Sequence, residues 1–337
     1  MDSRHLSYFR EIVDSGSMTA AARKLGIAQP SLSQHVKNLE QHLGVDLLMR
    51  TTRGVVVTKA GQVLYDHAVR VMELLQTAED QVRASGGEPY GRVVFGLPAS
   101  VSMALSVPLA ETVRVEMPKV SLCAVDAMSG HIKQWLREGQ VDIGLLYDLD
   151  GLEDYRARAV LTEDLFFFSA PDSWPFESEP GEPVSLTDLR NLELILPSGR
   201  HGLRLMVERV TKAAHLSLNV VIEMDSLPQI KTLVARGSGY TILSPAAAHD
   251  LIETGTLVQA PIIDPVIRRP LYLVRSATTG TTSTSLAVER LCEDVIRDLV
   301  GRGIWQATLL GQGDVIAASD DIDSPSENDA VQVAATR

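Results

Sequence analysis

The spacing of apolar residues divides the chain into regions with different periodicities. Residues 1–58 form short helical blocks separated by Gly16, Gly26, Gly44 and Gly54. A long helical pattern follows over residues 59–84, and from residue 92 short apolar runs alternate with amphipathic stretches. Such alternation of strand and helix patterns is typical of α/β domains. From about residue 312 the chain is acidic and without periodicity, which predicts disorder.

Residues 17–40 predict two short helices joined by a tight turn. Ser17 is a good N-cap, because its hydroxyl can accept a backbone N–H of the first turn. Gly26 provides the backbone freedom that the turn needs. Pro30 suits the first position of the second helix, where its missing N–H costs nothing. The pattern predicts a helix-turn-helix over residues 18–37.

The outer face of the second predicted helix is polar but almost uncharged. Its side chains belong to Gln29, Ser31, Ser33, Gln34 and Lys37. Amides and hydroxyls are the groups that read base edges in the major groove, and the lysine can contact phosphate. An ordinary helical hairpin with a polar face is the simpler alternative.

The long helical pattern carries the a/d repeat of a coiled coil. Apolar residues recur at alternating spacings of four and three: Leu64, Ala68, Val71, Leu75, Ala78 and Val82. A flexible break over residues 85–89 follows, so we expect this helix to pair with a second copy. An amphipathic helix packed on its own domain would show a similar stripe.

These motifs together resemble the DNA-binding signature of the LysR-type transcriptional regulators. The matching positions are Ser17, Ala21, Ala22, Leu25, Ile27, Gln29, Pro30, Ser31, Leu32, Ser33, Leu39, Glu40, Leu43, Gly44, Leu47, Arg50, Thr58, Ala60 and Gly61. Leu48 departs from the family, which usually has phenylalanine there, and this affects packing under the wing. The resemblance implies base-edge contacts from Gln29, Pro30, Ser33 and Gln34. It also implies contacts to the DNA backbone from Lys37 and Arg50, and a minor-groove contact from Arg53 in the wing. The implied DNA-contacting set is Gln29, Pro30, Ser31, Ser33, Gln34, Lys37, Arg50 and Arg53. A two-fold pair would read an inverted repeat.

The resemblance extends over residues 90–300 to the two-lobed sensor of the family, which has a periplasmic-binding-protein-like (type 2) α/β fold. Such a fold holds a small ligand between its lobes. The candidate effector contacts are Ser100, Ser102, Ser129, His131, Tyr147, Ser198, His201 and Arg204. Each has a structural alternative, since a serine after a strand commonly caps a helix and Arg204 on a surface helix would be solvated.

We therefore expect an α/β protein whose N-terminal part is mainly α. The expected segments are a winged helix-turn-helix (1–58), a linker and dimerisation helix (59–88), an effector-binding domain (89–305) and an acidic tail (306–337). Lobe one would span about 92–161 and 268–300, and lobe two about 162–267. The chain would cross between the lobes near 147–161 and 263–269.

Charge and cysteine content narrow the class of protein. Residues 1–60 carry eight Lys/Arg and five Asp/Glu, a net of +3, whereas the whole chain carries −12. The remaining 277 residues therefore carry −15, and only the N-terminus is expected to face a polyanion. Cys123 and Cys292 are the only cysteines, which predicts two reduced thiols in a cytoplasmic protein. We expect no signal peptide, membrane span, metal or cofactor.

The sequence contains no convincing motif for an enzyme active site. Asp188, Ser198 and His201 are close in sequence, but closeness in sequence is not the geometry of a catalytic triad. Residues 237–240 lead into a predicted strand, the reverse of the order that a phosphate loop needs. We expect no enzymatic activity.

The expected function is that of a homo-oligomeric transcriptional regulator, activator or repressor. It would bind promoter inverted repeats as a dimer of dimers, contact RNA polymerase, and respond to a small-molecule effector between the lobes. Residues 96–98, 129–130 and 142–148 are similar to the nitrogen-assimilation-control branch, in which a coinducer is not an established requirement. Two alternatives stay open. One is an effector-independent regulator of that type, and the other is a small-molecule-binding α/β protein with an incidental helical hairpin.

Overall fold

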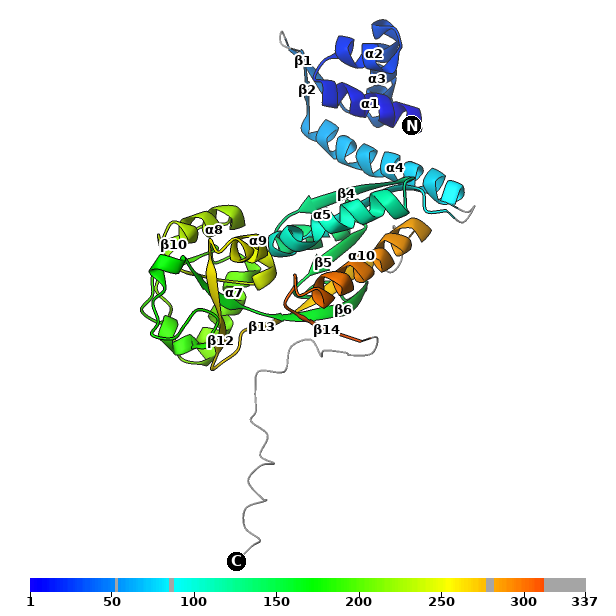
Figure 1. The fold of residues 1–337 in the computed structure, drawn as a ribbon. Helices are drawn as coiled ribbons and strands as arrows, with labels where there is room; N and C mark the ends of the chain where they lie inside the picture. The colour runs from blue at the N-terminus through cyan, green and yellow to red at the C-terminus, as the bar shows by residue number, and fades with distance from the viewer. Residues whose placement is uncertain (52–53, 85–87, 277–281, 312–337) are drawn as a thin grey trace, which may run out of the picture. The chain divides into compact units, whose positions relative to one another are not determined.

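The computed structural model describes residues 1–51, 54–84, 88–276 and 282–311 (Figure 1). These residues form two compact units. One comprises residues 1–92 with short segments at 119–121 and 282–284, and the other comprises the rest. Arg53 and residues 312–337 of the predicted acidic tail lie outside the described residues. The tail was predicted from residue 306, which is too early, because Thr308–Leu309 form a strand that pairs with Leu161 and Thr162. No helix in the described part of the chain is long and apolar enough to cross a membrane.

The N-terminal unit is a winged helix-turn-helix, as predicted. Its elements are α1 (Ser3–Ser15), α2 (Met18–Leu25), α3 (Gln29–Leu43), β1 (Leu48–Thr51), β2 (Gly54–Val57) and α4 (Lys59–Ala84). Strands β1 and β2 pair antiparallel to make the wing. Helix α1 packs against α2, α3 and α4, and its Phe9 and Ile12 side chains are fully buried.

The turn between α2 and α3 uses the predicted residues. The Ser17 hydroxyl accepts the Ala20 N–H at 3.4 Å. Gly26 ends α2 with a φ of 67°, a left-handed conformation that glycine adopts without strain. Helix α3 begins at Gln29, so Pro30 occupies the second helical position rather than the first. Its missing N–H still falls among those that the first turn leaves unpaired.

The beginning of α4 is fixed against the wing. The Thr58 hydroxyl donates to the carbonyl of Asp46 at 2.8 Å and accepts the Gly61 N–H at 3.0 Å. A Cβ at Gly61 would collide with the carbonyl oxygen of Leu47, so only glycine allows this close approach. Leu48 packs against both apolar clusters of this unit, consistent with its expected place under the wing.

The second unit contains two α/β lobes. The first lobe is built on a six-stranded sheet with the order β14-β6-β13-β5-β3-β4, in which β3 and β5 are parallel and β13 runs antiparallel to β5 and β6. Its strands are β3 (Gly91–Leu97), β4 (Val120–Asp126), β5 (Ile143–Leu146), β6 (Tyr155–Asp164), β13 (Arg268–Ser276) and β14 (Thr308–Leu309). Its helices are α5 (Ala99–Glu116), α6 (Ser129–Glu138) and α10 (Ser283–Gly301).

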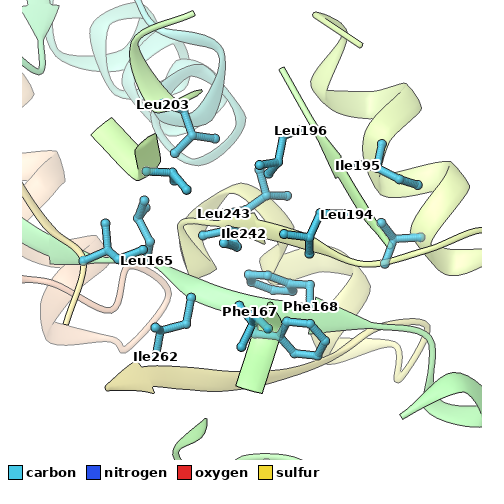
Figure 2. Packing of buried hydrophobic residues seen from close by; sticks show 14 of the residues in the cluster. Leu165, Phe167, Phe168, Leu194, Ile195, Leu196, Leu203, Ile242, Leu243 and Ile262 are labelled. Atoms are coloured by element: carbon cyan, nitrogen blue, oxygen red, sulfur yellow. The ribbon is translucent and has the colours of Figure 1, made fainter. Parts of the chain in front are cut away.

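The second lobe has a four-stranded sheet, β11-β7-β12-β8, and a parallel pair, β10-β9. Its strands are β7 (Phe166–Ser169), β8 (Val184–Ser185), β9 (Leu194–Leu196), β10 (Val220–Glu223), β11 (Thr241–Leu243) and β12 (Val258–Ile263). Its helices are α7 (Gly202–Ala213), α8 (Leu227–Ala235) and α9 (His249–Glu253), with 3-10 turns at Pro171–Ser173, Leu186–Leu189 and Pro245–Ala248. Leucine, isoleucine and phenylalanine side chains from β7, β9 and β11 meet in one buried core (Figure 2).

Two crossings connect the lobes. Strand β6 stays in the first sheet through Asp164, so the outgoing crossing lies later than the predicted 147–161. The return occurs between Ile263 and Arg268, where it was expected. Leu165 donates its N–H to the carbonyl of Ile267 at 2.8 Å, so the two crossings run side by side.

Candidate DNA-binding surface and interlobe cavity

Most of the predicted DNA-contacting residues of α3 lie together. A groove along α3 is lined by Gln29, Pro30, Ser33, Gln34 and Lys37 of that set. Within the helix, Nε2 of Gln29 donates to Oγ of Ser33 at 2.8 Å, and Nε2 of Gln34 donates to Oδ1 of Asn38 at 2.8 Å. These bonds limit the rotamers of both amides. Ser31 is exposed at the beginning of α3 but does not line the groove.

This surface carries little net charge. Lys37 is exposed on α3. Glu40 lies on the same helix, but its carboxylate accepts the N–H groups of Leu47 at 2.8 Å and Leu48 at 3.2 Å, which fixes the loop before the wing. The surface therefore offers hydrogen-bonding groups for base edges with few charges for phosphate.

The two predicted arginine contacts belong to the wing. Arg50 lies in β1, opposite Val55 of β2. Arg53 lies outside the described residues. Contact of either arginine with DNA stays a prediction.

The predicted dimerisation seam is divided between two environments. Leu64 packs against the cluster of Phe9 and Leu47 in its own unit, and Ala68 is fully buried. The remaining seam residues are exposed: Val71, Leu75, Ala78 and Val82. The first part of the stripe thus serves its own domain, and the later part is the part available to a second copy.

A cavity of about 190 Å³ lies between the two lobes. The polar residues that line it are Ser100, Asp126, Ser129, Tyr147, His201, Asp225, Ser244 and Arg269. Four of the eight predicted effector contacts are in this set: Ser100, Ser129, Tyr147 and His201. The structure brings these four together from both lobes, although they come from four separate segments of the chain.

Two further predicted serines, Ser198 and Ser102, do not line the cavity but hydrogen-bond to carboxylates that do. The Ser198 N–H and hydroxyl donate to the Asp225 carboxylate at 2.9 and 3.0 Å, and these bonds hold the pKa of Asp225 below its ordinary value. Partial burial raises the pKa of Asp126, and a hydrogen bond from Ser102 opposes that rise. Both serines therefore position carboxylates that line the cavity.

The other two predicted contacts are not at the cavity. The His131 ring is exposed and stacks on Trp135, with the ring centroids 6.0 Å apart. Arg204 lies beside a separate hollow on the second lobe, where it pairs with Glu208 at 2.5 Å and with Glu223 at 3.1 Å. Two carboxylates already neutralise this guanidinium, so Arg204 is poorly suited to bind the carboxylate of an effector.

His201 has a structural task as well as a place in the cavity wall. Its Nδ1 accepts the Leu203 N–H at 3.2 Å and so caps the N-terminus of α7. Burial lowers the pKa of His201, and the negative charge of Asp225 opposes this only in part. The neutral imidazole is the form that can cap the helix, because a protonated ring has no acceptor.

A buried polar network that includes three of the cavity's lining residues, Tyr147, Ser244 and Arg269, joins the lobes. Its centre is the Glu163 carboxylate on β6, which pairs with Arg269 on β13 at 2.6 Å. Glu163 also accepts hydrogen bonds from Tyr147 at 3.0 Å, Ser244 at 2.6 Å and Trp305 at 2.8 Å. Both charges of the pair are almost fully buried, but each compensates the other, and the three donors further stabilise the Glu163 carboxylate.

The guanidinium of Arg269 already has its charge and hydrogen-bond partners within this network. It lies 3.6 Å from the centre of the Tyr147 ring and donates to Oγ of Ser100 at 3.2 Å. Burial raises the pKa of Tyr147, so its hydroxyl stays protonated and can donate to Glu163.

Sequence reasoning missed several of these residues. Asp126 and Asp225 lie at or just after strand ends, as Ser129 and Ser198 nearly do, so the rule that selected serines at strand ends could have selected them too. Glu163 and Arg269 gave a weaker signal: each is a charged residue next to an apolar run, Arg269 at the end of one predicted crossing and Glu163 just after the other.

Two family models match the chain. "Bacterial regulatory helix-turn-helix protein, lysR family" matches residues 3–62, and "LysR substrate binding domain" matches residues 86–296. The first match argues against an incidental helical hairpin on an unrelated α/β protein, because it covers residues 3–62 of the winged unit. The second covers more than half of the chain.

Relatives with curated names extend over almost the whole chain. The nitrogen assimilation regulatory protein nac of Klebsiella aerogenes is 33% identical over 303 residues, which are 90% of this chain and 96% of that protein. The nac protein of Escherichia coli strain K12 is 32% identical over 308 residues, 91% of this chain and 99% of the other. These similarities agree with the expected nitrogen-assimilation-control branch.

Solved structures support the fold. Full-length CbnR complexed with its target DNA superposes with a TM-score of 0.67 at 21% identity, covering 88% of this chain and 99% of the other. A full-length OxyR variant from Pseudomonas aeruginosa gives 0.62 at 21% identity, with 88% and 98% covered. A winged helix-turn-helix, a two-lobed sensor and two matching family models lead to one conclusion: the chain belongs to the LysR family of DNA-binding transcriptional regulators.

Proposed function

We propose that the protein binds promoter inverted repeats as a dimer of dimers, and that a small molecule in the interlobe cavity tunes its activity. One observation carries the proposal: within one LysR-family chain, an amide- and hydroxyl-lined groove on α3 accompanies a cavity built from both lobes. The activity would be activation or repression of transcription together with RNA polymerase. The segments proposed for these tasks are the winged unit (1–58), the linker helix (59–88) and the effector domain (89–305).

The DNA contact would be made by the N-terminal end of α3. Gln29, Ser33 and Gln34 would read base edges, and Lys37 would meet a phosphate. Pro30 and Ser31 would lie close to the same groove, and the wing would add Arg50 and Arg53. Support comes from the fold shared with CbnR, which has been solved in a complex with its target DNA.

Pairing of two chains would supply the affinity that one unit lacks. Residues 1–60 carry a net charge of only +3, so phosphate attraction by one copy is weak. The exposed residues Val71, Leu75 and Val82 on α4 would form the contact between two copies. Two recognition helices would then bind one duplex.

The proposal includes no catalytic activity and places the protein in the cytoplasm, where bacterial promoters are found. The curated relatives named above are regulators, which supports the first point. The expected lobes, 92–161 with 268–300 and 162–267, are proposed with one change: residues 162–164 and β14 belong to lobe one, because they are part of its sheet.

Retardation of the DNA upstream of the gene by the purified full-length protein tests the proposal. We expect a specific complex whose affinity falls linearly with the logarithm of salt concentration. Failure to retard that DNA at low salt would contradict it.

A thermal-shift screen of amino acids, amines, carboxylates and phosphorylated metabolites tests whether the cavity binds an effector, because a ligand of the native state raises the Tm. DNA binding with no ligand in the screen would favour an effector-independent regulator controlled by its own abundance.

A further inference from the structure

The charges around the interlobe cavity indicate what kind of effector it accepts, an inference that rests on the proposed role of that cavity. Asp126, at the end of β4, lines it from the first lobe, and Asp225, after β10, lines it from the second. Their hydrogen-bond partners named above, Ser102 and Ser198, are neutral. Both residues are exposed, and neither carboxylate has a lysine or arginine partner among the described residues.

No side chain of the cavity wall offers a free positive charge that could balance these carboxylates. The partial positive charge there comes from the N-termini of α5, α6, α7 and α8, whose first residues line the cavity. Arg269 is the only lysine or arginine among the lining residues, all of which the structure describes. Its guanidinium is neutralised by Glu163 at 2.6 Å and covered by the Tyr147 ring. His201 is neutral near pH 7 because burial lowers its pKa. A carboxylate ligand that does not displace Glu163 would therefore find helix N-termini but no free cationic side chain, and it would face Asp126 and Asp225.

We infer that the cavity accepts a compact organic cation, of the primary amine or diamine class, rather than a carboxylate. Ammonium groups would donate charge-assisted hydrogen bonds to Asp126 and Asp225. The apolar lining from Met128, Leu203 and Leu227 would contact a short alkyl segment between them. A cavity of about 190 Å³ limits the ligand to a small molecule.

The placement of the two carboxylates also connects ligand binding to lobe closure. Because one stands on each lobe, their like charges oppose closure, and a bridging cation removes that opposition. A diamine would thus bind the closed arrangement more tightly than the open one, which is the condition for shifting a conformational equilibrium.

Calorimetric titration of the full-length protein with 1,4-diaminobutane and butylamine tests this, with succinate and butyrate as anions of matched chain length. We expect saturable binding of the diamine, weaker binding of the monoamine and none of the anions. Asp126→Asn and Asp225→Asn should each weaken diamine binding about tenfold or more, since each removes one ionic partner while conserving shape. Asp154→Asn and Asp172→Asn are matched controls, because both acids are exposed, one on each lobe, and neither lines the cavity. They should leave the affinity unchanged.

Three outcomes would overturn the inference. These are binding of succinate or butyrate without either amine, no saturable amine binding up to millimolar concentration, and amine binding that both cavity variants leave intact. Thermal unfolding without ligand shows whether each variant is folded. DNA retardation by the same preparation keeps the two proposals apart. Retardation without amine binding defeats only the inference about charge, whereas loss of retardation defeats the proposed function itself.

Discussion

Arg269 and Glu163 lie directly opposite each other on the antiparallel strands β13 and β6, with Nη2 of Arg269 2.6 Å from Oε1 of Glu163. Their side chains are 3% and 0% exposed. Tyr147 of the first lobe and Ser244 of the second donate to the same carboxylate. The pair therefore lies beside the two chain crossings, and its hydrogen bonds connect the first lobe to the second.

Removal of one member of this pair should be costly. Glu163→Gln or Arg269→Met leaves the other group buried without its charge partner, and we expect the free energy of unfolding to fall by about 3–5 kcal/mol in each case. The double variant should lose clearly less than the sum of the single losses, because no uncompensated charge remains. Denaturant unfolding of the four proteins measures this. Simply additive losses would contradict a direct coupling between the two residues.

Replacement of Gln29 should separate base recognition from general DNA affinity. Gln29→Ala removes an amide that Ser33 holds in place, and the expected loss is about 1–3 kcal/mol for the specific site with little change for unrelated DNA. Lys37→Ala should weaken binding to all sequences alike and reduce the salt slope by about one. Retardation titrations on both kinds of DNA measure these effects. Gln62→Ala, on the exposed side of α4, is the control, and an equal loss on both DNAs for Gln29→Ala would argue against base contact.

A charge in the exposed part of the α4 seam should prevent assembly without unfolding the chain. Leu75 is 43% exposed, so Leu75→Glu costs the single chain little, but it would place two carboxylates in the contact between copies. We expect dissociation in sedimentation experiments and loss of specific DNA binding with an unchanged circular dichroism spectrum. Gln76→Glu puts the same charge one residue further along, off the seam, and should leave assembly intact. A Leu75→Glu protein that keeps its oligomeric state would rule out this contact.

His201 should make the protein sensitive to acid. The folded-state pKa of His201 lies below the ordinary value of 6.5, so between those two pH values the unfolded chain binds more protons than the folded chain. Its stabilising contribution is thus complete above about pH 6.5 and is lost as the pH falls toward the folded-state pKa. His201→Asn keeps an N-cap side chain for α7 but does not titrate. Comparison of unfolding free energies at pH 7 and pH 5 should show a smaller decrease for this variant, and equal decreases would contradict the assignment.

Elements that depend on interactions between residues close in sequence were predicted correctly, whereas strand β6, which depends on a distant partner, was not. The helix-turn-helix and the long helix over residues 59–84 depend on caps, glycines and periodicity within one segment, and both appear as predicted. The first part of strand β6 was expected to belong to a crossing between the lobes. It is a strand because β13, more than a hundred residues later, pairs along its length.

The candidate sites show the same division. By itself the sequence determined the family, the polar face of α3 and the residue types at the ends of the sensor strands, since these depend on local spacing. Only the tertiary structure decided that Leu64 and Ala68 turn into their own domain, and that Arg204 lies away from the cavity while Ser100, Tyr147 and His201 meet in it. It also decided that Arg269 is already neutralised by Glu163. The physical reason is that a side chain's charge and hydrogen-bonding capacity are set by neighbours that are distant in sequence and are brought together only by the packed sheets.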